Sequence, residues 1–286
     1  MTHYKIEAGT GQHIGDRSEQ QDRIALLQAP KAPGYMMAVL ADGMGGAGGG
    51  AIAAEQAVRT AQQVFERFSP LTDDIESMMR EIAGEIHTVI QLTSLASEIR
   101  PQTTLAMLVL TPQRTAIWGH AGDSRVCRFA GPNLAERTID HSYVDQGVRY
   151  RPGVSSAMFG SVTSAHPPGA SQGPAAVTLA STPTVLVNIL GKPGTTPLIS
   201  IGHYSNLQTG DAFLLCTDGL WHYCNDAECG AAIAMNSPRE AAQLLIRKAR
   251  ERATGDADNC TLGIVKLVAP VRETRNYQVD SLHRAV

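Results

Sequence analysis

The chain has 286 residues, of which 43% are hydrophobic and 18% are charged, and its formal net charge is −3. This composition is typical of a globular protein with a substantial core, arranged as one large domain or two small ones. The small net charge gives no support for a nucleic-acid partner or an anionic membrane, and no apolar run is long enough to cross a bilayer.

The N-terminal segment lacks the basic-then-apolar layout of a signal peptide, so we expect a cytoplasmic protein. Two apolar patches flank a polar stretch at 15–22, which predicts two short strands and a polar connection. A buried strand is predicted at 35–41, and Asp42 and six glycines within positions 43–50 follow it. Because glycine permits close backbone approach, this stretch is either an ion or phosphate site or an ordinary turn.

Two helices are predicted after the glycines. Apolar residues recur at helical spacing over 51–68, and Pro70 ends that helix. A second helix begins near Asp73, which we expect to cap it together with Glu76 three residues later. The short break between the helices predicts an antiparallel pair that covers one face of a sheet.

Three closely spaced strands are predicted at 103–110, 114–120 and 125–130, and their tight turns indicate an antiparallel meander. A polar interruption before the third strand has Asp123 at its centre. We interpret His120 as a buried core histidine.

The segment 147–194 is rich in Pro, Gly, Ser, Ala and Thr and contains no acidic residue, so we expect a long excursion. Regular structure resumes with a strand that ends at Asp218, then a short helix over 226–235. Ser237 and Glu240 predict the capped start of a further helix. A final strand is predicted at 262–268, and we expect a polar C-terminal tail at 271–286.

The cysteines are five in number and widely scattered, without the paired spacing of a zinc site. Most lie in or beside apolar runs, so we interpret them as buried structural thiols. They are Cys127, Cys216, Cys224, Cys229 and Cys260.

Three aspartates lie at predicted strand ends, namely Asp42, Asp218 and Asp258, and Asp22 lies in a further polar connection. Carboxylates that are brought together raise each other's pKa unless a cation is present. Mg²⁺ and Mn²⁺ are the hard cations that such sites bind. The pattern therefore indicates a divalent metal centre.

Several ordered motifs resemble those of the metal-dependent protein serine/threonine phosphatases of the PPM (type 2C) family, in its bacterial form. The resemblance covers roughly residues 10–268, nearly the whole chain. Its motifs are Arg17-Ser-Glu-Gln-Gln-Asp22, Asp42-Gly-Met-Gly-Gly46, Thr103-Thr104-Leu105, Gly122-Asp-Ser-Arg125, Asp140-His-Ser142, Asp218-Gly219 and Asp258-Asn-Cys-Thr261.

The resemblance implies an α+β fold, a four-layer αββα sandwich of two antiparallel sheets flanked by antiparallel helix pairs. Residues 1–270 would form a single catalytic domain, with 147–194 as a flap-like excursion beside the active site.

The resemblance also implies a set of metal ligands. Asp42 would bridge two Mn²⁺ or Mg²⁺ ions, and Gly43 would offer its carbonyl to one of them. Asp218 and Asp258 would complete the protein ligands of the first ion. A hydroxide that bridges the ions would attack phosphorus in line.

Three further site residues follow from the same resemblance. Asp22 would orient a metal-bound water or ligate the second ion. Arg17 would hold the substrate phosphate, which suits its planar guanidinium. Asp123 is the remaining ligand of a possible third ion, because His222 stands where members with that ion often have aspartate.

The sequence departs from the family pattern at other positions as well. Gln20 replaces the usual Asn, Gln102 the usual Gly, and Met44 and Ala47 stand where many members place a histidine nearby. No side chain is therefore an obvious proton donor for the leaving group, and a metal-bound water is the expected donor. His222 is interpreted as a surface residue, with a role as ligand or acid as the alternative.

The expected function is metal-dependent hydrolysis of phosphoserine and phosphothreonine on proteins by a monomer. The expected partners are phosphoproteins and a bacterial Ser/Thr kinase that the enzyme opposes. One alternative is a catalytically silent module that binds phosphoproteins, although such a module should have lost its metal aspartates. The sequence does not separate protein substrates from small phosphate esters.

Overall fold

A computed structural model of the chain describes residues 4–46, 48–96, 98–143 and 185–270. Most of the predicted excursion (147–184), the predicted tail (271–286) and Ala47 lie outside these residues. None of the helices in the described ranges is long and apolar enough to cross a membrane.

One sheet contains six strands, all paired antiparallel, in the order β11-β6-β5-β3-β2, with β4 paired to β3. Its central strands are apolar and almost completely buried, as expected for strands covered on both faces. The strands are β2 (Asp22–Gln28), β3 (Met36–Met44), β4 (Gln102–Thr103), β5 (Leu105–Leu110), β6 (Thr115–Ala121) and β11 (Ser200–Ser205).

The second sheet contains five antiparallel strands in the order β1-β13-β12-β7-β8, and a separate pair is formed by β9 and β10. In that pair, Tyr143 lies opposite Val185, so the two ends of the segment 144–184 are adjacent. The strands are β1 (Lys5–His13), β7 (Arg125–Ala130), β8 (Asn133–Arg137), β9 (Ser142–Tyr143), β10 (Val185–Leu186), β12 (Asp211–Cys216) and β13 (Cys260–Val268).

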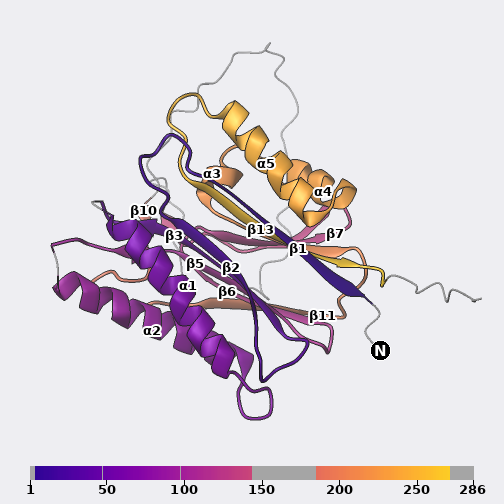
Figure 1. Ribbon diagram of the computed structural model, residues 1–286, viewed down its shortest axis with the longest axis horizontal. Helices are drawn as coiled ribbons and strands as arrows, with labels where there is room; N and C mark the ends of the chain where they lie inside the picture. Colours follow the sequence, from indigo (N-terminus) through magenta and orange to yellow (C-terminus); the bar gives the residue numbers. More distant parts are fainter. Residues whose placement is uncertain (1–3, 47, 97, 144–184, 271–286) are drawn as a thin grey trace, which may run out of the picture.

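The helices cover the outer faces of the two sheets (Figure 1). Helices α1 and α2 pack on the six-stranded sheet, and α4 and α5 pack on the five-stranded sheet. The predicted α+β class and the two antiparallel sheets are thus confirmed. The helices are α1 (Gly49–Arg67), α2 (Ile75–Leu95), α3 (Asp218–Trp221), α4 (Asp226–Met235) and α5 (Pro238–Arg252).

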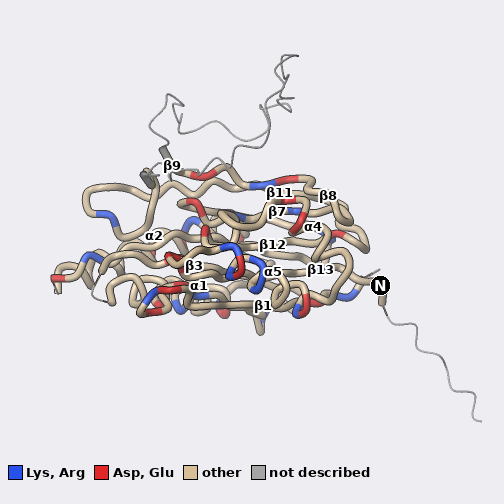
Figure 2. Tube along the Cα trace, turned by 90° about the horizontal axis from the view of Figure 1, so that it is seen from above, with Lys and Arg blue, Asp and Glu red and all other residues tan. Residues whose placement is uncertain are grey.

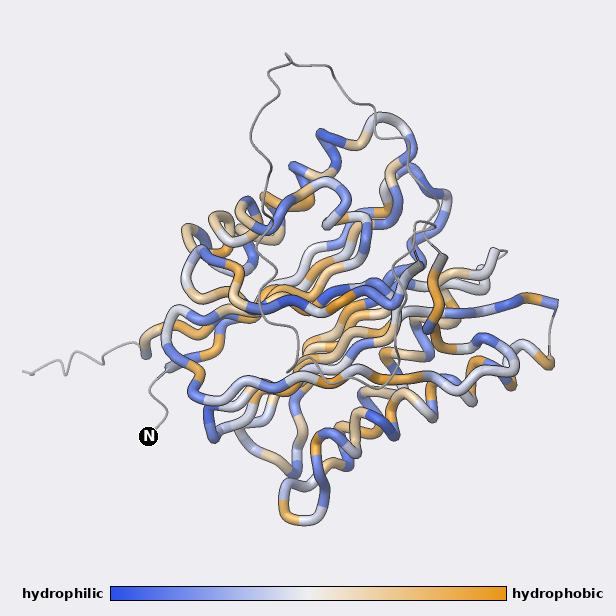
Figure 3. Tube along the Cα trace, turned by 180° about the vertical axis from the view of Figure 1, so that it is seen from behind, coloured by the Kyte–Doolittle hydropathy of each residue, from blue (hydrophilic) through white to orange (hydrophobic). Residues whose placement is uncertain are grey.

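Three hydrophobic cores separate the four layers, one under each helical layer and one between the sheets. Figure 3 shows the apolar residues concentrated along the central strands. The five cysteines are free, buried and part of the core beneath the C-terminal helices, which confirms their interpretation as structural thiols. Figure 2 shows acidic and basic residues interspersed along the chain.

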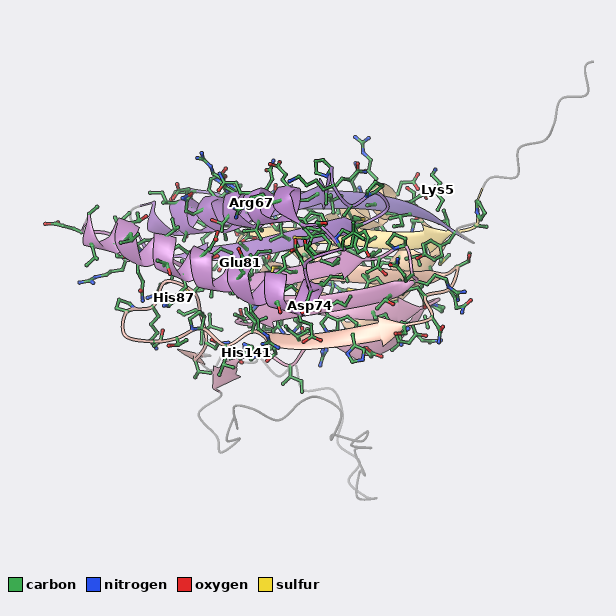
Figure 4. The ribbon with its side chains drawn as sticks, turned by 90° about the horizontal axis from the view of Figure 1, so that it is seen from below. Lys5, Arg67, Asp74, Glu81, His87 and His141 are labelled. Atoms are coloured by element: carbon green, nitrogen blue, oxygen red, sulfur yellow. The ribbon has the colours of Figure 1, made fainter. Side chains whose placement is uncertain are left out.

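The helix caps match the sequence prediction in one case and correct it in another. Ser237 and Glu240 form the predicted reciprocal capping box. The cap of α2, however, is Asp74, whose carboxylate accepts a hydrogen bond from the Ser77 amide (Figure 4). Asp73, one residue before the cap, instead accepts a hydrogen bond from the amide of Ser69, four residues earlier in the chain. The prediction was one residue out because either aspartate can serve as an N-cap.

Strand boundaries also differ from the prediction near the glycines. Strand β3 continues to Met44, so Asp42 lies inside the strand rather than after its end. Strands β8 and β11 were not predicted, since both lie at sheet edges and alternate polar with partly buried residues.

Candidate metal centre

A cleft of about 530 Å³ opens where the end of β3, the start of α3 and the residues before β13 meet. It contains all but one of the predicted site residues, since Asp22 does not line it. Its charged lining residues are Arg17, Glu19, Asp42, Asp123, Asp218 and Asp258, and Gly43, Met44, Leu186 and Asn259 are among the others.

The backbone of Asp42 is fixed by the two threonines of the predicted Thr-Thr element. The Asp42 amide donates to Thr104 Oγ1 at 3.0 Å. Its carbonyl accepts from Thr103 Oγ1 and from the Thr104 amide, both at 2.9 Å. Both threonines are fully buried, so the carboxylate of Asp42 is presented from a rigid section of β3.

Gly43 and Gly50 bring the end of β3 against the start of α1. A Cβ atom on Gly43 would lie 2.0 Å from the Gly50 carbonyl oxygen, and one on Gly50 would lie 2.6 Å from the Gly43 oxygen. Neither position can carry a side chain without a backbone shift. This contact supports the interpretation that glycines permit the sharp turn from strand into helix.

Asp22 lies beside Asp42 on the neighbouring strand and does not line the cleft. The two residues are opposite each other in the β2–β3 register, and Asp22 is only 1% exposed. Its carboxylate accepts a hydrogen bond from Thr217 Oγ1 at 3.0 Å. Burial raises its pKa to about 7, and the charges of Asp218 and Asp258 act in the same direction.

The buried carboxylates form a region of concentrated negative charge. Burial is the largest cause of the raised pKa of Asp42, and the charges of Asp22 and Asp218 come next. Burial likewise raises the pKa of Asp218 to about 6, followed by the charge of Asp258. Among the described residues, the buried Oδ1 atom of Asp218 has no hydrogen-bond partner. Such an oxygen, surrounded by other carboxylates, fits a divalent cation.

Asp258 forms an ion pair with Arg17. The guanidinium donates from Nε to Oδ1 at 3.1 Å and from Nη2 to Oδ2 at 2.9 Å. Within the described ranges, no three His, Cys, Asp or Glu side chains have the spacing of a formed metal site. Asp258 lines the same cleft as Asp42 and Asp218 while it is paired with Arg17.

Asp123 and His222 are the two residues that the sequence analysis linked to a possible third ion. Asp123 is 8% exposed, and burial raises its pKa to about 7, with the Asp218 charge as the second cause. His222 is exposed, and its Nδ1 lies 3.8 Å from Asp218 Oδ2. It does not line the cleft, which supports its interpretation as a surface residue.

The loop that carries Asp123 is hydrogen-bonded to His141, a residue to which the sequence assigned no role. His141 is labelled in Figure 4. Its amide donates to the Gly122 carbonyl at 2.9 Å, and its Nδ1 accepts from the Gly122 amide at 3.2 Å. The His141 ring stacks on His120, which is buried as predicted, at 4.3 Å between centroids. Burial lowers the pKa of His141 to about 3, so the ring is neutral at pH 7.

The guanidinium of Arg125 pairs with a carboxylate, as that of many buried arginines does. This pair stabilises the region around Asp123. The guanidinium makes two hydrogen bonds to Asp140, at 2.9 and 2.7 Å, and lies 3.7 Å from the ring centroid of Trp221. The Trp221 indole donates to the Asp123 carbonyl at 3.1 Å. These contacts give both residues structural roles.

Comparison with known proteins agrees with this geometry. A family model described as "Protein phosphatase 2C" matches residues 9–229. The "Serine/threonine phosphatase stp" of Listeria monocytogenes is 25% identical over 232 residues, 80% of this chain and 83% of that protein. "Protein phosphatase PhpP" of Streptococcus pneumoniae is 27% identical over 246 residues, 82% of this chain and 87% of its own.

Solved structures share the fold. The Mycobacterium tuberculosis serine/threonine phosphatase PstP/Ppp superimposes with a TM-score of 0.70 at 20% identity, covering 92% of this chain and 99% of that chain. A structure of the PstP catalytic domain in complex with two manganese ions has a TM-score of 0.68 at 20% identity, covering 92% and 98%. The fold of this chain is therefore the one on which those proteins are built.

Proposed function

This chain belongs to the protein phosphatase 2C family, so it is a metal-dependent protein phosphatase, and we propose that it hydrolyses phosphoserine and phosphothreonine in proteins. The single observation that carries the proposal is the crowding of Asp42, Asp218 and Asp123 in one cleft beside Arg17. The cofactors are two Mn²⁺ or Mg²⁺ ions, the cations that such carboxylate sites prefer.

We propose specific roles for the residues of the cleft. Asp42, Asp218 and Asp258 would hold the cations with their carboxylates, and Gly43 would contribute its carbonyl. Asp22, held by Thr217, would orient water or contribute to the second ion. When bound, the cations supply Lewis acidity toward the phosphoryl group and an activated water at neutral pH.

Arg17 would bind and orient the substrate phosphate in this cleft. Its guanidinium already makes a bidentate contact with the Asp258 carboxylate, and a phosphate presents the same pair of acceptor oxygens. Both partners are about half exposed, so exchanging one acceptor for the other costs little. Asp258 would then be released toward the cations as the phosphate enters.

The partners follow from this activity. We propose phosphoproteins as the substrates and a bacterial Ser/Thr kinase as the opposing enzyme, with residues 1–270 as one catalytic domain that acts as a monomer in the cytoplasm. A weaker candidate is a silent phosphoprotein-binding module, which the retention of every predicted metal aspartate disfavours.

The test is the rate of dephosphorylation of a phosphothreonine peptide with Mn²⁺, with Mg²⁺ and with EDTA. We expect Mn²⁺-dependent turnover that EDTA abolishes, and faster turnover of the peptide than of small phosphate metabolites. Turnover that persists in EDTA would contradict the proposed mechanism. Calorimetry that detects no Mn²⁺ binding, together with phosphopeptide binding without turnover, would favour the silent module.

A further inference from the structure

The loop at 14–21, which carries Arg17, contains no helix or strand, yet it is closely attached to the residues before β13. The Asp16 amide donates to the Ala257 carbonyl at 2.8 Å, and Asp16 Oδ2 accepts from the Ala257 amide at 2.9 Å. A Cβ atom on Gly15 would lie 2.2 Å from the Asp258 carbonyl oxygen. In Figure 1 this loop, in indigo, lies beside the yellow segment that leads into β13.

Asn259 is the side chain that ties this loop together. Its Oδ1 accepts from the Gln21 amide at 2.7 Å. Its Nδ2 donates to the carbonyls of Ile14, at 2.7 Å, and Glu19, at 3.0 Å. One buried amide, only 4% exposed, therefore binds the loop at its start, near its middle and at its end.

The chemistry at this position requires an amide. The two N–H groups and the carbonyl oxygen of Asn259 each have a partner, so no other common side chain of this size replaces all three contacts. Aspartate would keep the acceptor for Gln21 but lose both donors, and alanine would lose every contact. The backbone groups of Ile14, Glu19 and Gln21 would then lose these part-buried hydrogen bonds, and the loop would no longer be held in this conformation.

Asn259 also contacts the backbone that carries the predicted metal-binding aspartates. Its carbonyl oxygen lies so close to Gly219 that a Cβ atom there would be 2.1 Å away. Gly219 follows Asp218, and Asn259 follows Asp258. The residue thus joins the backbone that presents two carboxylates to the loop that presents Arg17.

We propose that Asn259 is a positioning residue for Arg17, which fixes the guanidinium at the distance from Asp218 and Asp258 that phosphate binding requires. The inference rests on the proposed function of Arg17. It concerns phosphate affinity rather than metal affinity. Among the described residues, the hydrogen bonds of the Asn259 side chain go to the loop, whereas its contact to the Asp258 carboxylate is made by the backbone amide, which a substitution retains.

The test measures the affinity of the Mn²⁺-loaded protein for inorganic phosphate by calorimetry, in a double-mutant cycle with Arg17→Ala. We expect Asn259→Ala to weaken phosphate binding about tenfold, as the misplacement of one charge-assisted contact predicts. In the Arg17→Ala background, the same change should alter affinity less than about twofold, because the two residues act through one contact. The Mn²⁺ affinity should stay that of the parent.

Two further variants keep the inference falsifiable. Asn259→Asp retains the contact to Gln21 and covers the case in which Asn259→Ala does not fold. Asn236→Ala is the matched control, because this asparagine also donates to a backbone carbonyl, that of Ala232 at the end of α4, away from the cleft. Parent-like phosphate affinity in folded Asn259 variants, or an equal effect with and without Arg17, would overturn the inference.

The experiments distinguish a failure of this inference from a failure of the proposed function. Phosphate binding that depends on Asn259 without any turnover of phosphopeptide would contradict the proposed function and support the inference. Turnover by the parent, with kcat and KM unchanged in Asn259→Asp, would support the function and contradict the inference. If the inference is correct, KM for p-nitrophenyl phosphate rises in the variants while kcat changes little.

Discussion

The two sides of the cleft hold their charges in different ways. On one side, Asp42, Asp22 and Asp218 are crowded together, and burial raises the pKa of each. On the other side, Arg17 and Asp258 form a bidentate pair with 50% and 44% of their side chains exposed. Among the described residues, no lysine or arginine forms a salt bridge with a carboxylate of the first side, although the charges of Arg17 and Arg125 lower the pKa of Asp218. The second side is a paired couple that is accessible to solvent.

This difference indicates that the two sides of the cleft have different functions. Buried carboxylates that repel one another provide affinity for divalent cations. An exposed ion pair contributes little to stability, so its arginine is available to another acceptor. The buried side is therefore suited to retaining cations, and the exposed side to exchanging substrate and product.

The largest expected effect comes from changing the buried side. Asp42→Asn should lower kcat for a phosphothreonine peptide at least about 1000-fold, because metal-ion catalysis supplies several kcal/mol of transition-state stabilisation. Stopped assays over a range of Mn²⁺ concentrations measure the loss. Asp74→Asn is the matched control, since asparagine caps a helix as well as aspartate does. Near-parent activity in Asp42→Asn would remove the residue from the metal centre.

A smaller effect is expected on the exposed side. Arg17→Ala should lower kcat/KM by about 10- to 100-fold, mainly through KM, because a bidentate contact to the phosphate is lost. The Mn²⁺ concentration for half-maximal activity should remain within a factor of about two. If that concentration rises strongly instead, Arg17 supports the metal ligands, and the division between the two sides is wrong.

The pH dependence of stability in EDTA distinguishes the two sides without any assay of activity. The folded-state pKa of Asp22 is about 7, above its unfolded value near 4, so the folded chain binds the additional proton. This contribution is fully present below pH 4 and is lost as the pH rises through 7. Between pH 5 and 8 it should lower the free energy of unfolding by about 2–3 kcal/mol.

Denaturant titrations at several pH values measure this slope. Asp22→Asn should reduce it relative to the parent, while Asp74→Asn, at an exposed cap, should leave it unchanged. An identical slope in Asp22→Asn would show that the carboxyl of Asp22 does not carry the buried proton.

The smallest effect is expected at His222. The residue is exposed and does not line the cleft, so His222→Ala should change kcat by less than about threefold. A general acid would contribute about 100-fold or more. A loss of that size, measured with the phosphothreonine peptide, would assign His222 a role in the reaction and extend the working region beyond the cleft described above.

Much of the fold could be predicted from the sequence because its signals are local. Apolar runs and helical spacing predicted most strands and helices, and Ser237 with Glu240 predicted the start of α5 correctly. The edge strands β8 and β11 were missed because edge strands lack a continuous apolar run.

The candidate site was predictable as a set of residues but not as an arrangement. Asp42 and Asp218 follow recognisable apolar runs, and all the predicted aspartates but Asp22 line one cleft. The pairing of Arg17 with Asp258 and the contacts of Asn259 join segments about 240 positions apart. No local pattern encodes such contacts, because they depend on how two irregular loops meet after the sheets have formed.

The pairing of β9 with β10 has a consequence for exchanging parts between related proteins. Since Tyr143 and Val185 are register partners, the two described residues that flank positions 144–184 lie side by side. Lengthening a connection whose ends are already adjacent costs only about 0.6 kcal/mol for each doubling. The residues between these two positions can therefore differ in number and composition from one homologue to the next while the sandwich stays the same, which makes this a natural junction for building chimaeras.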